Sequence, residues 1–186
     1  MRCTASILNI VIEYELIRRD VKNPRLEFRG GELYLIVPKS FMEHEIIIRK
    51  HRRWIYNHYS KVQKIQEVSQ NIELVSGRSV DELKSLVNKC VIIIGKELEV
   101  KPENVRFRKM RTKWGSCSSK GNLNFNTFLQ YLPDEMVEYI VHHEMVHLIE
   151  LNHSPKFWDH VKKRYPDYKE SETRLAAYWT LIQQKC

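Results

Sequence analysis

Residues 143–147 are His-Glu-Met-Val-His, and residues 152–154 are Asn-His-Ser. Side chains four residues apart lie on one face of an α-helix, so we expect His143 and His147 to present ring nitrogens to a single metal ion. Glu144 would then lie beside the metal, where a general base can take a proton from metal-bound water. The pattern predicts a zinc hydrolase site on one helix and the turn after it.

The sequence around this motif indicates a buried helix. Residues 132–135 are Leu-Pro-Asp-Glu, which is typical of a helix start with proline at the first helical position and acids in the first turn. From Met136 onward, apolar residues occur on two sides, which predicts a buried helix whose histidines face inward. The competing interpretation takes His143 and His147 as ordinary core or surface histidines, although buried ionisable rings need partners in any case.

A third metal ligand is expected at His153. This residue follows His147 by six positions, so the helix must end and the chain must turn back towards the metal. Asn152 tolerates the left-handed conformation that such a turn requires, and Ser154 with Pro155 predicts the start of a new helix. A later carboxylate is the alternative third ligand, and the candidates are Asp167, Glu170 and Glu172.

Three segments of the chain resemble the YgjP-like family of metal-dependent hydrolases, which is related to the SprT-like and WLM zincin peptidases. The segments are Lys113–Asn124, Tyr139–Leu148 and Asn152–Trp158, and the resemblance extends over nearly the whole chain. It implies a zinc metallopeptidase that acts on peptides or proteins, with Glu144 as the catalytic base. The zinc ligands that it implies are His143, His147 and His153. His142 departs from the family pattern, which more often has an apolar residue there.

We expect an α+β, zincin-like fold in which a small antiparallel sheet packs on helices that include the H-E-x-x-H helix. The chain is predicted to form a single domain over residues 1–186, with an N-terminal β-rich part (1–41), linking helices (42–98) and a catalytic core (99–186). Alternating residues predict one strand over residues 7–17, a β-hairpin extension around Gly30-Gly31, and a second hairpin from residues 105–113 and 122–129. Helical periodicity predicts helices over residues 42–68 and 80–98.

The strand over residues 122–129 is a candidate edge for binding an extended peptide, and an ordinary core strand is the equal alternative. Trp114 and Gly115 are expected to shape the wall of the site. Cys117 is either a thiol near zinc or a small buried residue in a turn. The candidate oxyanion donors are Tyr131, Tyr165, Tyr168, Arg111 and Arg174, and the candidate hydrogen-bond acceptors for the ligand histidines are Asp159, Glu170 and Glu172.

Composition indicates an ordinary globular chain, with 42% hydrophobic and 29% charged residues. The four cysteines, Cys3, Cys90, Cys117 and Cys186, form no C-x-x-C pair, which favours a reducing, cytoplasmic location. No apolar run approaches the length of a membrane span, so no membrane partner is expected.

The net charge of +8 suggests an anionic partner. Residues 1–66 contain 13 basic and 7 acidic residues (+6), and residues 67–186 contain 18 and 16 (+2). The run Arg49-Lys50-His51-Arg52-Arg53 is either a solvated helix face or a nucleic-acid contact. The alternative function is therefore a basic nucleic-acid-associated protein with a structural zinc, or a protease that acts on DNA-bound proteins. A second basic cluster, predicted to line the cleft or bind an acidic substrate, is Arg106, Arg108, Lys109, Arg111 and Lys113.

Overall fold

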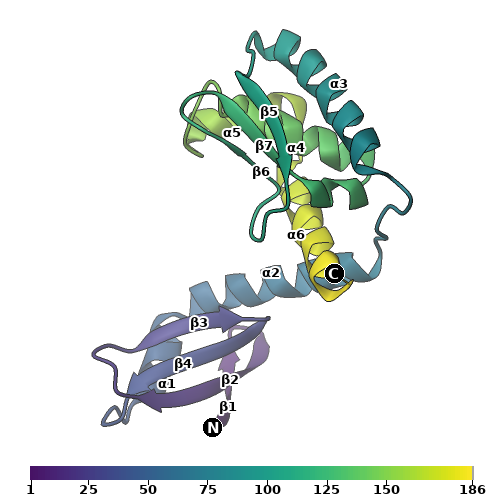
Figure 1. The fold of residues 1–186 in the computed structure, drawn as a ribbon. Coiled ribbons are helices and arrows are strands. Elements are labelled where there is room, and N and C mark those ends of the chain that lie inside the picture. The colour runs from purple at the N-terminus through teal and green to yellow at the C-terminus, as the bar shows by residue number, and fades with distance from the viewer. Residues whose placement is uncertain (186) are drawn as a thin grey trace. The chain divides into compact units, whose positions relative to one another are not determined.

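The computed structural model describes residues 1–185 and divides into two compact units, Met1–Gln66 and Glu67–Cys186 (Figure 1). Cys186, one of the four cysteines noted above, lies outside the described residues. The division falls near residue 66, between the boundaries at 41 and 98 expected from the sequence. A single domain over residues 1–186 stays a prediction.

The first unit is built on a four-stranded sheet with the order β1-β2-β4-β3. Its strands are β1 (Arg2–Ile7), β2 (Ile10–Arg19), β3 (Arg25–Arg29) and β4 (Glu32–Pro38). β2 pairs with β4 in parallel, and the other two pairs are antiparallel. Two helices follow, α1 (His44–Lys50) and α2 (Arg52–Gln70), and they add Ile48 and Ile55 to the core of this unit.

The predicted single strand over residues 7–17 is wrong, because Leu8 adopts a positive φ of 54° and turns the chain back after β1. Five of the six residues 7–12 are apolar, so the turn lies within a run that resembles one continuous strand. The hairpin around Gly30-Gly31 is present as β3 and β4, and it forms part of a larger sheet than the expected extension.

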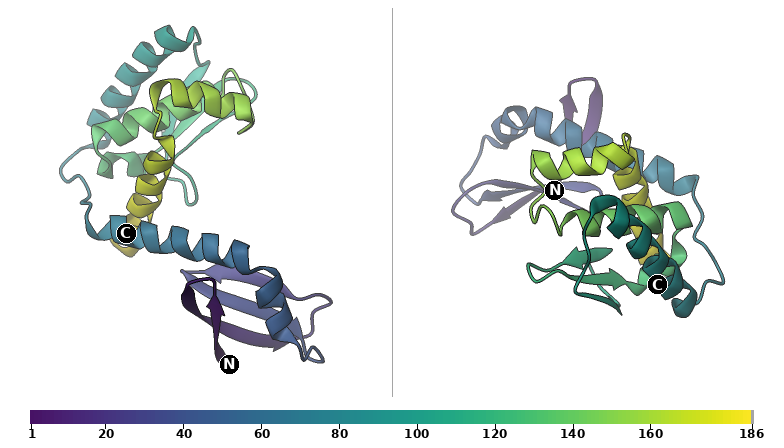
Figure 2. Two further views of the ribbon diagram at one scale, coloured as in Figure 1. Left: turned by 180° about the vertical axis from the view of Figure 1, so that it is seen from behind. Right: turned by 90° about the horizontal axis from the view of Figure 1, so that it is seen from above.

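The second unit begins with α3 (Val80–Leu98), as predicted for residues 80–98. A capping box defines its start, because the Ser79 hydroxyl accepts from the Glu82 amide while the Glu82 carboxylate accepts from the Ser79 amide. The remaining elements are β5 (Asn104–Arg108), β6 (Gly115–Cys117), β7 (Asn122–Asn126), η1 (Thr127–Tyr131), α4 (Asp134–Val146), α5 (Pro155–Arg164) and α6 (Tyr168–Lys185). Figure 2 shows these helices and the sheet from two further directions.

The predicted hairpin between residues 105–113 and 122–129 is wrong. β5 and β7 are parallel neighbours, and the short strand β6 is the antiparallel partner of β7, so the sheet has the order β5-β7-β6 and is mixed rather than antiparallel. Alternation along a strand indicates which residues face the core, but it contains no information on strand direction.

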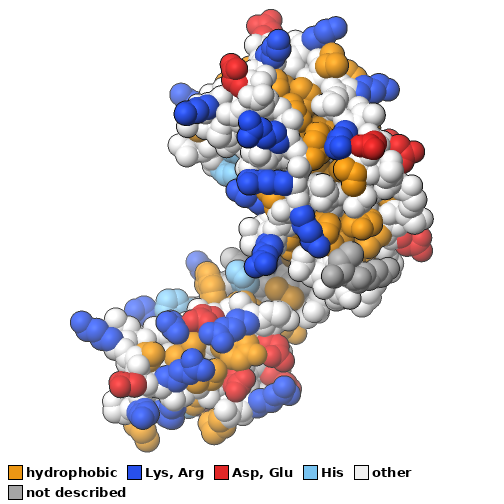
Figure 3. All heavy atoms as spheres, viewed as in Figure 1, with side chains coloured by type: hydrophobic (Ala, Val, Ile, Leu, Met, Phe, Trp, Pro, Cys, Tyr) orange, Lys and Arg blue, Asp and Glu red, His pale blue; other side chains and the backbone are white. Residues whose placement is uncertain are grey.

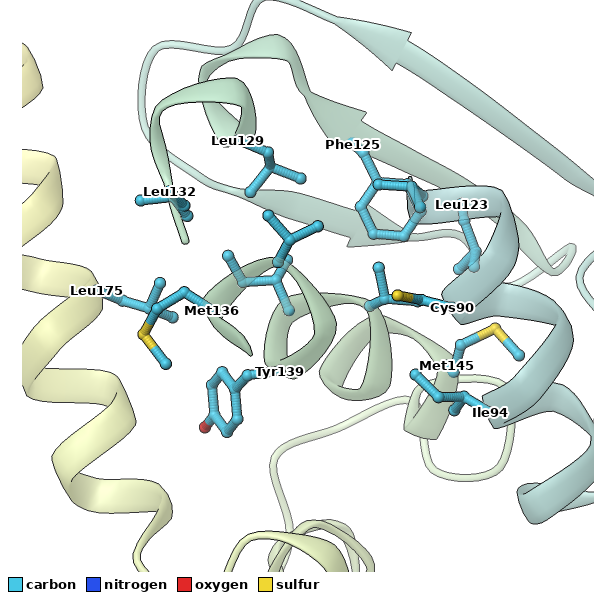
Figure 4. Packing of buried hydrophobic residues seen from close by; sticks show 14 of the residues in the cluster. Cys90, Ile94, Leu123, Phe125, Leu129, Leu132, Met136, Tyr139, Met145 and Leu175 are labelled. Atoms are coloured by element: carbon cyan, nitrogen blue, oxygen red, sulfur yellow. The ribbon is translucent and has the colours of Figure 1, made fainter. Parts of the chain in front are cut away.

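The core of the second unit surrounds α4 (Figure 4). Leu123 and Phe125 of β7 pack on one side of it with Ile94 of α3, while α6 adds Leu175. Nine of the thirteen residues of α4 are buried, which agrees with the prediction of a helix that is apolar on two sides. The α+β class is confirmed, and none of the helices within residues 1–185 is long and apolar enough to cross a membrane.

Candidate metal centre

The histidine motif lies at the C-terminal end of α4. Asp134 and Glu135 occupy the first turn as expected. Pro133, which was predicted at the first helical position, is the N-cap, so the helix begins one residue later than expected. His143 and Glu144 lie in the last turn of the helix, and His147 is its C-cap. Because α4 packs against the sheet and three helices, the backbone that carries these side chains is firmly held.

The chain turns immediately after His147. The ring Nδ1 of His147 lies 3.0 Å from the carbonyl oxygen of Glu150, so Nδ1–H donates to this turn and leaves Nε2 free to bind a metal. Helix α5 then begins as the sequence predicted, with Pro155 at its start and the Ser154 hydroxyl accepting from the Phe157 amide at 3.3 Å. His153 immediately precedes this N-cap, at the corner between two helices.

The structure brings His143, His147 and His153 together. One ligand nitrogen from each ring lies within 4.8 Å of the other two, and the Nε2 atoms of His143 and His153 are 2.9 Å apart. Two nitrogens bound about 2.0–2.1 Å from a tetrahedral zinc would be separated by roughly 3.4 Å. The nitrogens of His143 and His153 would have to separate by about 0.5 Å, and the three rings are close enough together to share one metal ion.

Burial keeps His143 and His147 in the neutral form that metal binding requires. Desolvation, with the charges of His147 and His153, lowers the pKa of His143 to about 3. Desolvation also lowers the pKa of His147, which is 8% exposed. Neutral imidazoles offer a lone pair without first losing a proton, so the group is suited to binding a metal at neutral pH.

Glu144 is buried beside this group and is 7% exposed. Desolvation raises the pKa of its carboxyl to about 7, although the charge of Lys113 and a hydrogen bond from the Cys117 amide oppose that shift. Gly115 gives the carboxylate its space, because a Cβ added there would lie 2.7 Å from both Cγ and Oε1 of Glu144. The carboxyl is thus confined between α4 and β6.

Glu172 approaches the group from α6. Its Oε1 accepts a 2.7 Å hydrogen bond from the Tyr139 hydroxyl and lies 4.0 Å from Nδ1 of His143. This agrees with the prediction that Glu172 lies near a ligand histidine. It approaches Nδ1 of His143, whereas Nε2 of the same ring faces His153. The other carboxylates considered from the sequence, Asp159, Asp167 and Glu170, do not line the cavity.

A cavity of about 450 Å³ opens over the histidines. Its lining residues are Thr112, Lys113, Trp114, Gly115, Ser116, Cys117, Ile140, His143, Glu144, His147, Leu151, His153, Glu172 and Leu175. Trp114 and Gly115 form part of the wall as expected. Cys117 also lines the cavity, from a strand rather than the predicted turn, and burial and Glu144 raise the pKa of its thiol.

The candidate oxyanion donors are not brought to this cavity, since none of the five lines it. Arg174 pairs with Glu135, and Tyr168 stacks on Trp158 with ring centroids 4.5 Å apart.

Sequence reasoning missed Asn126, whose fully buried side chain supports the wall. Its Nδ2 donates to the carbonyls of Met110 and Lys113, and its Oδ1 accepts from the amides of Met110 and Phe128. Three of these four hydrogen bonds hold the loop that leads into β6, and the fourth caps η1. Its residue type gave no signal, because Asn122, Asn124 and Asn126 alternate with Leu123 and Phe125 along β7.

Comparison with known proteins identifies the family of this chain. The sequence profile described as YgjP-like, metallopeptidase domain, matches residues 78–178, which is more than half of the chain. No curated protein matches the chain. The metallopeptidase zymogen abylysin of Pyrococcus abyssi is 27% identical in sequence and superposes with a TM-score of 0.44. The match covers 48% of this chain and 90% of the abylysin chain. The metallopeptidase zymogen jannalysin of Methanocaldococcus jannaschii is 24% identical in sequence and superposes with a TM-score of 0.41. The match covers 56% of this chain and 97% of the jannalysin chain. The profile match establishes that the chain belongs to the YgjP-like metallopeptidase family and is a metal-dependent hydrolase.

Proposed function

We propose that the protein is a zinc-dependent peptidase in which His143, His147 and His153 hold the metal and Glu144 is the general base. One observation carries the proposal: three imidazole nitrogens within 4.8 Å of one another and a buried carboxylate share a single cavity. Peptides or proteins are the substrate class expected of the family.

The donor set favours zinc in a catalytic rather than a structural role. Imidazole ligands suit zinc, and a site with three protein ligands leaves one tetrahedral position open. Structural zinc sites usually take four protein ligands, often thiolates, and within residues 1–185 no cysteine joins the three histidines. The alternative function, a nucleic-acid-associated protein with a structural zinc, has no use for Glu144.

His143, His147 and His153 would hold the zinc, which would supply a Lewis acid able to acidify water and polarise a substrate carbonyl. The side chains around it handle the protons. Glu144, with a pKa near 7, can accept a proton from water and pass it to the leaving amine. The hydrogen bond from His147 to the Glu150 carbonyl holds the ring in the tautomer that binds metal.

The substrate backbone is expected to pair with β6. This strand is at the edge of the sheet and lines the cavity, whereas the strand favoured from the sequence, β7, is central and has no free edge. An extended peptide added to an edge strand gains main-chain hydrogen bonds that are independent of most side chains. Residues 115–117 would therefore position the scissile bond beside Glu144.

The Glu144→Gln variant tests the proposal. We expect it to keep one zinc per chain, measured by plasma mass spectrometry, and to lose about 10²–10⁴-fold in peptide hydrolysis because the general base is gone. Glu170→Gln is the matched control, since Glu170 is an exposed carboxylate outside the cavity. Full activity of Glu144→Gln would contradict the role of Glu144, and zinc retained after replacement of His153 by Ala would contradict the ligand set.

Nucleic-acid binding stays a prediction, as does a cytoplasmic location. The run Arg49–Arg53 spans the end of α1 and the start of α2. Salt-dependent binding of a DNA duplex by the purified chain would support the alternative function, and no binding at low salt would remove it.

A further inference from the structure

The sheet of the second unit and its loops contain cations and no acids. Between Glu103 and Asp134 the chain has no Asp or Glu. The six cations of this stretch are Arg106, Arg108, Lys109, Arg111, Lys113 and Lys120. Figure 3 shows Lys and Arg side chains gathered over this sheet and the loop beside it, with few acidic side chains among them.

These cations are exposed and free of salt bridges. Arg106 and Arg108 point away from the core, because Val105 and Phe107 take the alternate, half-buried positions of β5. Among the residues that the structure describes, none of the six is in an ion pair. By contrast, the other arginines of this unit, Arg78, Arg164 and Arg174, each pair with a carboxylate.

Hydrogen bonds to a buried side chain hold the loop that carries several of these cations. The loop over residues 109–114 joins β5 to β6, and the buried Asn126 side chain bonds its backbone at Met110 and Lys113. The Asn126 amide also donates to the Trp114 carbonyl at 2.8 Å. Charges on such a fixed loop lose less conformational freedom on binding a ligand than charges on a mobile one.

The cationic segment leads into the metal centre. Thr112 and Lys113 line the cavity, and the chain then continues directly into β6. The acids of the cavity are on the helices: Glu144 belongs to α4 and Glu172 to α6. Of the six cations, Lys113 lines the cavity beside β6, and the loop that carries Lys109 and Arg111 connects this wall to β5.

We propose that residues 106–113 bind acidic side chains of the polypeptide substrate, so that the enzyme prefers clusters of Asp and Glu on one side of the scissile bond. This inference rests on the proposed function. Exposed arginines match carboxylates in bidentate geometry, and unpaired charges of one sign attract a ligand of the opposite sign. An acidic polypeptide is favoured over nucleic acid because the cationic segment ends at Lys113, which lines the cavity that must hold the scissile peptide.

Cleavage of a mixed peptide library, with products identified by mass spectrometry, tests the preference. We expect Asp and Glu to be enriched at two or more positions on one side of the cleaved bond. Three exposed charge contacts of ordinary strength should give an acidic peptide about a tenfold higher kcat/KM than its neutral counterpart at low salt. The difference should lie mainly in KM and should shrink at about 0.5 M salt, where screening is strong.

The charge-reversal variant Arg108→Glu with Arg111→Glu should abolish or invert this preference. The matched control is Lys89→Glu with Lys96→Glu, which makes the same charge change at exposed positions of α3 outside the cavity. The control should keep the preference of the wild type. Equal cleavage of acidic and neutral peptides, or an acidic preference that survives reversal at Arg108 and Arg111, overturns the proposal.

Binding distinguishes this inference from the proposed function. Glu144→Gln protein should bind a fluorescent hexa-aspartate-containing peptide more tightly than its lysine counterpart, and the reversal at Arg108 and Arg111 should remove the difference. Absence of peptide cleavage by the wild type would contradict the proposed function and leave this binding result to decide the inference. If a DNA duplex of equal charge binds more tightly than the peptide through Arg108 and Arg111, the cations serve nucleic acid and the proposal is wrong.

Discussion

Replacing Gly115 with Ala should disable the enzyme without removing its metal. A Cβ at this position would lie 2.7 Å from Cγ and Oε1 of Glu144 and 2.9 Å from its Cδ. The three nearest atoms all belong to Glu144. Gly115 does not have a positive φ, so alanine meets a steric conflict rather than backbone strain.

The size of the effect follows from these contacts. Carbon atoms in ordinary contact are about 3.5–4.0 Å apart, so the Glu144 carboxyl must move by roughly 1 Å. Glu144 is only 7% exposed and has little room to move away without disturbing its neighbours. A misplacement of about 1 Å in a catalytic group can cost about 10²-fold, and we expect a loss of that order in kcat/KM. The free energy of unfolding should fall by about 1–3 kcal/mol, as is usual for an overpacked core.

The assay compares peptide hydrolysis, zinc content and urea denaturation of the wild type and the variant. Gly95→Ala is the steric control, because its added Cβ would lie 2.8 Å from the Val100 carbonyl oxygen, at the end of α3. This control should lose stability and retain kcat. The double variant Gly115→Ala with Glu144→Gln should lose no more activity than Glu144→Gln alone, because both changes act on the same carboxyl.

Two results would refute the reasoning. A Gly115→Ala enzyme with activity within about threefold of the wild type would mean that the Glu144 position is not critical to the reaction. An equal loss of kcat in Gly95→Ala would mean that general destabilisation, and not the displaced carboxyl, lowers activity.

Three further predictions concern stability. Burial lowers the pKa of His142 to about 4, so below about pH 6.5 the unfolded chain takes up a proton at this residue while the folded chain does not. In the metal-free protein His142 should by itself make unfolding about 2 kcal/mol easier between pH 7.5 and 5, and His142→Leu should reduce the pH dependence by that amount in urea titrations. Chelation should lower Tm, and free zinc at about 100 times Kd should restore about 2.7 kcal/mol, whereas a His143→Ala chain should show no such response by calorimetry. Asn126→Ala leaves buried backbone groups of Met110, Lys113 and Phe128 without their hydrogen-bond partner. The free energy of unfolding, measured by urea denaturation, should fall by about 3 kcal/mol or more. The control Lys89→Ala, at an exposed position, should change it by no more than about 0.5 kcal/mol.

Local features of the structure agree well with the sequence. The spacing of His143 and His147 on a helix, the hydroxyl cap at Ser154 and the capping box at Ser79 all depend on residues within one turn of each other. Such interactions repeat with helical geometry, so residue type and spacing are enough to predict them.

Strand pairing was predicted less well. The direction of β5 relative to β7 depends on how the loop over residues 109–114 is held, and that in turn depends on Asn126, which lies 16 residues after Met110. Leu8 likewise turns the chain without glycine, asparagine or proline at its own position. The turn at Leu8 lies within an almost unbroken apolar run, and alternation along β5 contains no information on its direction, so neither event could be predicted from the apolar pattern.

The sequence by itself determined the motif helix, the corner at His153 and the residues suited to bind a metal, because these follow from contacts between near neighbours. Only the tertiary structure decided what surrounds them. It placed Gly115 against Glu144, Glu172 beside His143 and Lys113 at the cavity, and none of the five candidate oxyanion donors lines that cavity. Those contacts join residues far apart in the chain, and their geometry arises from the packing of the sheet and α6 around α4.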